Sequence, residues 1–341
     1  MISVLFCIKI ATTRKIMYYI PMTIYLSIAF FVFGAIIGSF LNVVLYRFNT
    51  GKGLGGRSKC SSCKRVLSVA DLFPIASWLM LGGRCRTCKS KISSQYVLVE
   101  IFTAVLFLFV YLKNASILEA SPLIFAISTV VSLVIMSLLV LITVYDLKHK
   151  IIPDEFSYSF AVIAFLQIFL NFNCQNSPIC FGLPFAAGGI FGSEAILILL
   201  SGIFVAFPFY FIWLVSGGRW MGLGDGKLAL GIGWLLGIKY GFSAIVFAFW
   251  IGAVISLIVM VGVAVMKFIS RKINKRRRRL MDCADGKCVN RALESLEKNV
   301  EGLSTIRFKS EIPFAPFLIL GLLIVFFLNI SVMDFLAIFT S

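Results

Sequence analysis

The segment Gly217-Gly218-Arg219-Trp220-Met221-Gly222-Leu223-Gly224-Asp225-Gly226-Lys227 separates two long apolar runs and places one carboxylate between them. An ionised aspartate beside hydrophobic spans loses roughly several kcal/mol of hydration unless it is paired or protonated. Glycine lacks a Cβ and permits positive φ, so a glycine-rich break suits a site where backbone or a small substrate approaches an acid closely. For this segment alone, a polar turn with a helix-capping aspartate is an equally good interpretation.

A second lone acid occupies the same kind of position. Asp146 lies at the end of another apolar run, and Pro153 and Asp154 follow, where we expect the next helix to begin. Two carboxyl groups that share a proton are the minimum set for aspartyl proteolysis, because the neutral and the ionised group together activate water against a peptide carbonyl. We therefore predict Asp146 and Asp225 as a catalytic pair, and we interpret the nearby His149 as a solvated loop residue.

The composition is that of a membrane protein. Hydrophobic residues make up 60% of the 341 residues, charged residues 14%, and the mean hydropathy is +0.99. Repeated apolar runs of about 20 residues predict membrane spans. The formal charge of +17 is concentrated in loops, which indicates topology, so we expect no nucleic-acid partner. We predict an all-α, polytopic membrane helical protein with about eight transmembrane helices and a cytoplasmic zinc-binding loop domain.

The first basic loop, residues 47–95, contains ten Lys or Arg and a single acid, Asp71. It also contains two C-x2-C pairs separated by 21 residues. Two such pairs can close a tetrahedral site with four thiolates and leave no open position for catalysis. The loop therefore predicts a structural zinc ion, with free thiols or, more weakly, disulfides as the alternatives. The predicted ligands are Cys60, Cys63, Cys85 and Cys88.

The remaining segments follow from the same patterns. Gly34 and Gly38 of the first span, Met22–Tyr46, have a small-xxx-small spacing that favours close helix packing. The residues before this span are interpreted as a short tail, and the start codon is left open. We divide the chain into a tail and first span, the zinc loop, a transmembrane aspartyl peptidase core, a basic cytoplasmic loop and a last span, at 1–46, 47–95, 96–266, 267–311 and 312–341.

Two polar segments have open interpretations. Residues 171–193 contain no Lys or Arg and are expected outside the cytoplasm, where Cys174 and Cys180 could pair in an oxidising compartment. Residues 267–310 carry 13 basic residues, typical of a solvated tail or a site for anionic lipid. Cys283 and Cys288 of that segment are interpreted as free thiols.

Taken together, the motifs resemble the bacterial type IV prepilin peptidases, also described as prepilin leader peptidase/N-methyltransferases. The matching pieces extend from about Gly34 to Gly321 and include both cysteine pairs. The others are Gly38-Ser39-Phe40-Leu41-Asn42-Val43-Val44 with Arg47, Ser77-Trp78-Leu79 with Gly83-Arg84, Tyr96 with Glu100, Asp146 to Asp154, Gly222-Leu223-Gly224-Asp225, and Ile312-Pro313-Phe314 with Pro316-Phe317.

The resemblance implies a multi-pass aspartyl endopeptidase of the bacterial inner membrane, acting in type IV pilus assembly and protein secretion. Such enzymes remove the short basic leader of prepilins and pseudopilins after a glycine, at the cytoplasmic face. They commonly methylate the new N-terminus with S-adenosylmethionine, whose binding residues stay unassigned here. Asp146 and Asp225 match the catalytic pair of the family.

Two other readings remain open at this point. Presenilin-type and signal-peptide-peptidase-type proteases also carry a Gly-x-Gly-Asp motif, although they lack a cysteine loop and their acids lie deeper in the spans. A zinc-stabilised transporter or scaffold would instead use Asp146 and Asp225 as an ion path. Proton-coupled flux without peptide cleavage would select that reading.

Overall fold

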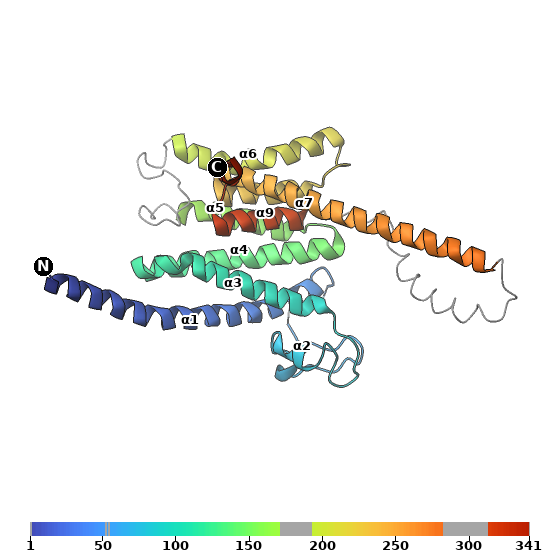
Figure 1. Ribbon diagram of the computed structural model, residues 1–341, viewed down its shortest axis with the longest axis horizontal. Helices are drawn as coiled ribbons and strands as arrows, with labels where there is room; N and C mark the ends of the chain where they lie inside the picture. Colours follow the sequence, from blue (N-terminus) through green and yellow to red (C-terminus); the bar gives the residue numbers. More distant parts are fainter. Residues whose placement is uncertain (1, 52, 54, 171–192, 282–312, 341) are drawn as a thin grey trace.

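The chain folds into a bundle of long helices, seen in a computed structural model that describes residues 2–51, 53, 55–170, 193–281 and 313–340 (Figure 1). The segments that hold Cys174, Cys180, Cys283 and Cys288 lie outside these ranges. The helices are α1 (Ile2–Arg47), the 3-10 helix η1 (Val69–Asp71), α2 (Ala76–Met80), α3 (Ser94–Ala120), α4 (Pro122–His149), α5 (Asp154–Leu170), α6 (Ser193–Ser216), α7 (Leu223–Met281), α9 (Ala315–Leu328) and α10 (Val332–Thr340).

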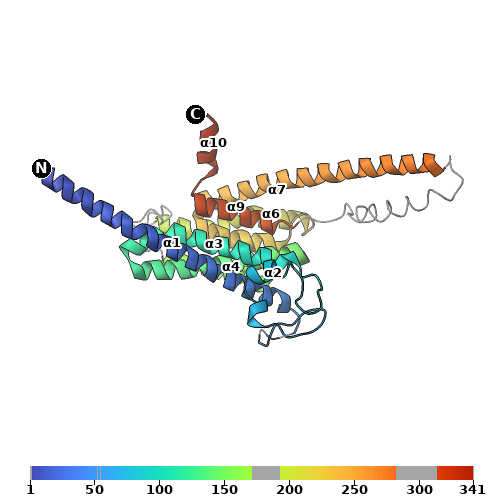
Figure 2. The same ribbon diagram turned by 60° about the horizontal axis from the view of Figure 1, so that its bottom comes forward.

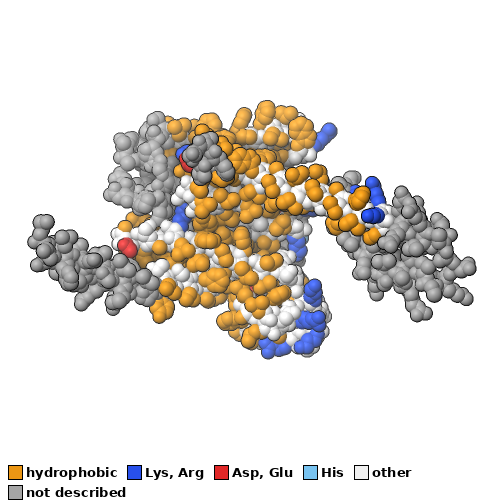
Figure 3. Space-filling model, in the orientation of Figure 1, with side chains coloured by type: hydrophobic (Ala, Val, Ile, Leu, Met, Phe, Trp, Pro, Cys, Tyr) orange, Lys and Arg blue, Asp and Glu red, His pale blue; other side chains and the backbone are white. Residues whose placement is uncertain are grey.

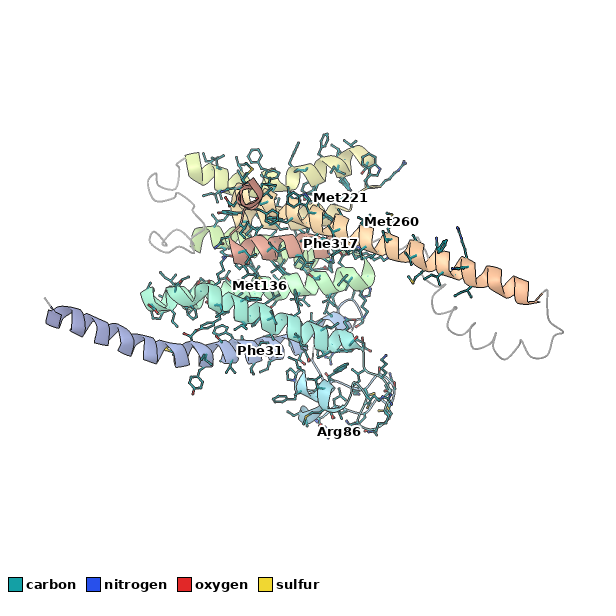
Figure 4. The ribbon with its side chains drawn as sticks, viewed as in Figure 1. Phe31, Arg86, Met136, Met221, Met260 and Phe317 are labelled. Atoms are coloured by element: carbon teal, nitrogen blue, oxygen red, sulfur yellow. The ribbon has the colours of Figure 1, made fainter. Side chains whose placement is uncertain are left out.

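Neighbouring helices pack in a continuous order: α1 on α3, α3 on α4, α4 on α5 and α9, and α7 between α5, α6 and α9. The centre of the bundle is largely apolar, and Met136 of α4 lies in it (Figure 4). Because the spans are apolar on all sides, they are covered by other helices or by lipid rather than by water. Side chains buried completely at this centre are Met136, Leu139, Ile142, Phe160, Leu228 and Leu322.

Five of the described helices are long and apolar enough to cross a membrane, and α9 is a shorter apolar helix. One of the five, α7, consists of two legs, because its backbone leaves the helical conformation at Gly237, with φ 75° and ψ 179°. Beyond this break the chain returns, so that Gly241 lies against Gly233. With both legs of α7 and the shorter α5 and α9, the described part of the chain has about eight apolar legs, as predicted.

The ends of these helices follow local rules. Ser93 and Ser121 accept hydrogen bonds from the backbone N–H groups that begin α3 and α4, and Pro122 occupies the first turn of α4. A single residue, Ser121, separates the two helices, so α3 and α4 form a tight hairpin. The cysteine-containing loop that leads into α3, the start of α3 and the end of α4 therefore lie at one end of the bundle, called here the site end.

The predicted small-residue face of the first span is confirmed as a packing surface. A Cβ added to Gly34 would lie 2.7 Å from the Cα atom of Ala104, and one added to Gly38 would lie 2.8 Å from the Cα atom of Glu100. These distances are too short for any side chain, so both glycines let α1 and α3 approach closely. Asn42, one turn further along, donates to the backbone carbonyl of Tyr96 at 3.0 Å.

Three boundaries differ from those expected. The first helix extends back to Ile2, and α7 continues through Met281, so the first part of the expected basic loop is helical; residues 282–312 lie outside the description. The last span is divided, because Asn329 ends α9 in the left-handed conformation and Ser331 caps a new helix with Asp334. Figure 2 shows α10 turned away from the bundle.

Candidate active site and metal centre

The two predicted acids come from different helices at the site end. Asp146 lies in the last turn of α4, which Lys150 ends in the left-handed conformation, and Asp225 lies in the first turn of α7. Both side chains are buried, with 4% and 9% of the residue surface exposed. They lie within electrostatic range of each other, since Asp146 exerts a Coulombic influence on Asp225. The structure thus brings together two acids that are distant in sequence.

The segment that follows Asp146 is in direct contact with the segment that precedes Asp225. Ile152, after α4, packs against Gly224, and a Cβ added to that glycine would lie 3.0 Å from the Cβ atom of Ile152. Glycine at this position therefore lets the backbone of α7 approach the α4–α5 connection closely. This contact fixes the first turn of α7, and with it Asp225, against the segment that follows Asp146.

The hydrogen bonding of the two carboxyl groups is incomplete. The Asp146 carboxyl group accepts a hydrogen bond from the backbone N–H of Ala315, at the start of α9, yet its Oδ2 atom is buried and has no partner among the described residues. Buried polar atoms without partners are rare and often mark functional positions. Asp225 accepts from the backbone N–H of Gly222, the residue before α7 begins, so it is the third residue of the helix and not its N-cap residue, although its carboxyl group does satisfy a backbone group at the helix start.

An ion pair beside the acids was missed from the sequence. Lys227 on α7 donates to Asp154 at the start of α5, with Nζ and Oδ1 separated by 2.6 Å. The Lys227 ammonium also lies 4.8 Å from the centre of the Tyr158 ring. Asp154 begins α5 as predicted, but it additionally joins α5 to α7 two residues beyond Asp225. By contrast, His149 is exposed and stacks against Tyr145, so it does not join the acidic pair.

The four predicted cysteine ligands converge. Their sulfur atoms all lie within 4.8 Å of one another, close enough for a single metal ion to be bound by all four. Each C-x2-C pair is a short hairpin of the same form: Cys60 and Cys85 each donate from the backbone N–H to a carbonyl five residues later, with Lys64 and Lys89 in positive-φ positions. The pattern is an internal repeat of one metal-binding turn.

Backbone geometry also prepares the thiols for metal binding. The backbone N–H groups of Cys63 and Ser62 lower the pKa of the Cys60 thiol to about 6. A thiolate, rather than a thiol, is the form that binds a metal ion. The loop can therefore bind a metal ion through Cys60, Cys63, Cys85 and Cys88.

The loop's only acid connects the two cysteine hairpins. The carboxylate of Asp71 accepts from Arg65 at 2.6 Å and from Arg86 at 2.9 Å, one arginine from each hairpin. Arg86 lies well away from the helical bundle, inside the loop (Figure 4). Hydrogen bonds from the backbone and hydroxyl of Ser68, and then the two arginines, hold the pKa of Asp71 below its usual range. A single acid in a basic loop was the sequence signal for this role.

Comparison with known proteins agrees with this arrangement. A model of the Bacterial Peptidase A24 N-terminal domain matches residues 32–114, and one of the Type IV leader peptidase family matches residues 133–257. The first region covers the last third of α1, the cysteine loop and most of α3, and the second covers both acids. No solved structure matches the chain significantly.

Several curated proteins are similar to most of the chain, and each is named prepilin leader peptidase/N-methyltransferase. The Bacillus subtilis (strain 168) protein is 31% identical over 65% of this chain and 79% of its own length. The Pectobacterium carotovorum protein is 29% identical, over 67% and 81%, and the Aeromonas hydrophila protein 30% identical, over 63% and 74%. With these matches and two buried acids beside a four-cysteine loop, the chain belongs to the type IV leader peptidase family.

Proposed function

We propose that this protein removes the leader peptides of type IV prepilins or pseudopilins, with Asp146 and Asp225 as its catalytic pair. The observation that carries the proposal is the meeting of these two buried carboxyl groups at the site end, one of them with a free oxygen. Family membership supports the peptidase activity, and the names of the relatives supply the substrate class.

The chemistry requires the two acids to hold one proton between them. The ionised carboxylate takes a proton from a water molecule, whose oxygen adds to the carbonyl carbon of the peptide bond. The neutral carboxyl group gives its proton to the carbonyl oxygen. When the tetrahedral intermediate collapses, a proton passes to the amide nitrogen, the C–N bond breaks, and a carboxylic acid and a free amine leave.

We further propose that the loop metal is zinc in a structural role and that the enzyme methylates the new N-terminus. Four thiolates satisfy zinc and leave no position for a catalytic water. The relatives' names support the methyl transfer, for which S-adenosylmethionine would supply an electrophilic methyl group to the amine. A multi-pass protein that cuts basic leaders would act at the cytoplasmic face of the inner membrane, as the basic loop 47–95 also indicates.

The test is leader removal in cells that lack their own prepilin peptidase. Asp146→Asn and Asp225→Asn are each expected to abolish cleavage of a co-expressed prepilin, measured by the shift of the pilin band, while the membrane level of the variant protein is unchanged. Glu155→Gln is the matched control, because Glu155 is an exposed acid in the first turn of α5. Wild-type cleavage by either aspartate variant would show that the pair is misassigned.

A second measurement distinguishes peptide cleavage from transport. Mass spectrometry of the processed pilin reads the cut position and any added methyl group together. Proton-coupled flux through liposomes that contain the protein, without cleavage of a prepilin, would instead select an ion path through the same acids. Zinc content of the purified protein, compared with a Cys60→Ser and Cys85→Ser double variant, tests the metal.

A further inference from the structure

The cysteine loop is hydrogen-bonded to the side of the membrane-spanning helix α3, at a position inside the apolar part of that helix. The backbone N–H of Ile75, just before α2, donates to the carboxylate of Glu100 at 2.7 Å. Glu100 is the seventh residue of α3, so this contact lies roughly 9 Å along the helix from Ser94. The apolar part of α3 begins at Val97, which places the contact about one turn inside it.

The backbone at this contact is strained, which shows that the contact is specific. Ile75 has φ 60° and ψ −55°, a conformation that is rare for a β-branched residue. It is the centre of a γ-turn closed by a hydrogen bond from Ala76 to Pro74 at 2.5 Å. Strain of this kind persists only where the surrounding structure enforces it. Glu100, itself bonded to Ser39 of α1, provides that constraint.

The segment held at this depth exposes apolar side chains. Residues 72–83 contain no charged side chain, and α2 packs against η1. Phe73 is 62% exposed and Met80 is 88% exposed. We refer to the four exposed apolar residues of this segment as the apolar ridge: Leu72, Phe73, Leu79 and Met80.

The basic side chains of the loop gather away from these apolar residues. In Figure 3 the hydrophobic side chains of the loop continue the apolar flank of the bundle, and Lys and Arg side chains gather along its outer edge. Exposed basic residues of the loop include Arg57, Lys59, Lys64, Lys89 and Lys91. An apolar face beside a basic one is typical of segments that lie in the plane of a membrane surface and contact anionic headgroups.

We propose that the apolar ridge lies at the boundary between the headgroups and the acyl chains of the bilayer, where it anchors the cysteine loop to the membrane surface. Lipid is the occupant that fits the depth of the Glu100 contact, since segments of this type are buried about 5–10 Å into that boundary. It also fits the continuity of the ridge with the lipid-facing flank, where Leu98 of α3 is exposed. The ridge goes beyond the peptidase activity, because it concerns how the loop is held.

A photoreactive amino acid tests which molecule covers the ridge. We would place p-benzoylphenylalanine at position 80 of the full-length protein, irradiate intact membranes and identify the adducts by mass spectrometry. Lipid adducts are expected at position 80, and roughly tenfold fewer at position 89, where Lys89 occupies an exposed hairpin turn. Adducts to a pilin or to a second copy of the chain, or equal lipid labelling at the two positions, would overturn the proposal.

A charge substitution gives an independent test. Met80→Glu removes no internal contact of importance, because the side chain is almost fully exposed, and it should leave the metal content in detergent unchanged. In liposomes, the added charge of Met80→Glu should force the apolar ridge out of the boundary between headgroups and acyl chains. Trypsin should then cut the loop of this variant several-fold faster than the loop of the wild-type protein. Met80→Leu, which keeps an apolar side chain at the same position, is the matched control and should be cut at the wild-type rate. Equal trypsin rates for Met80→Glu and the wild type would contradict a lipid anchor.

Discussion

Replacing Gly224 by alanine should displace the two acids proposed as the catalytic pair without removing either. The added Cβ would lie 3.0 Å from the Cβ atom of Ile152 and 3.2 Å from its Cδ1 atom. These contacts are tighter than almost all real Cβ contacts, so one segment must give way by a few tenths of an ångström. Ile152 is β-branched and its Cβ is attached to the backbone, so the main chain itself has to move.

The displacement falls on the segments that position Asp146 and Asp225. A 1 Å misplacement of reacting groups costs about 10²-fold in rate, so a shift of a few tenths of an ångström should make Gly224→Ala cleave prepilin roughly 3- to 10-fold more slowly. The loss of folding stability should be modest, about 1–3 kcal/mol, as for other overpacked sites. The assay is initial-rate cleavage of a purified prepilin by the enzyme in liposomes, normalised to enzyme content.

Gly226 provides a matched control on the same turn. A Cβ added there would lie 3.5 Å from the Tyr210 ring, an ordinary contact, so Gly226→Ala should keep its rate within about twofold of the wild type. Adding Ile152→Ala to Gly224→Ala removes the Cδ1 contact and should restore part of the rate. If the Gly224 and Gly226 variants cleave equally fast, the contact with Ile152 does not position the acids.

Three further predictions test other contacts. The Asp71→Asn variant should release the loop metal to a chelator faster than the wild type at pH 7. Because the pKa of Asp71 is lowered in the folded state, its carboxylate stabilises the loop above the ordinary aspartate pKa of about 3.9, and this stabilisation is lost as the pH falls below that value. The release rates of the variant and the wild type should therefore converge in acid. The Lys227→Met variant should cleave prepilin several-fold more slowly than the wild type, with little change in KM. Adding Asp154→Asn to it should lower the rate no further, because the two residues form one ion pair. Additive rate losses would exclude a shared ion pair. Gly321→Ala should destabilise the protein by about 1–3 kcal/mol in a thermal melt, because its Cβ would collide with the backbone of Ala244, while Gly262→Ala, which meets open space, should be neutral or stabilising.

Much of this arrangement could be predicted from local patterns. The apolar runs indicated the number of helical legs, the C-x2-C spacing indicated four converging sulfurs, and the lone acids at the ends of apolar runs indicated Asp146 and Asp225. Each of these features is encoded within a short stretch, so local composition and spacing were enough to predict it. The catalytic role of the pair is still a prediction, although the proximity of the two acids agrees with it.

Contacts between distant segments could not be predicted in this way. The pairing of Lys227 with Asp154 and of Ile75 with Glu100 depends on how helices are placed beside one another, which a single sequence does not specify. The break at Gly237 had a partial signal in the short apolar run before it. The division of the last span at Asn329 had a signal as well, since Ser331 and Asp334 have the spacing of a capping box.

The helices around the acids are short, and this has a consequence for the surrounding lipid. Two of them, the first leg of α7 from Leu223 to the break at Gly237 and α9, have lengths of roughly 21–23 Å, less than the 30 Å hydrocarbon core of a typical bilayer. Neighbouring α3 and α4 exceed that thickness. Mismatch of this kind is relieved by local thinning of the bilayer, which brings the aqueous boundary closer to Asp146 and Asp225. Hydrolysis consumes water, and an uneven hydrophobic thickness would supply it beside the two acids.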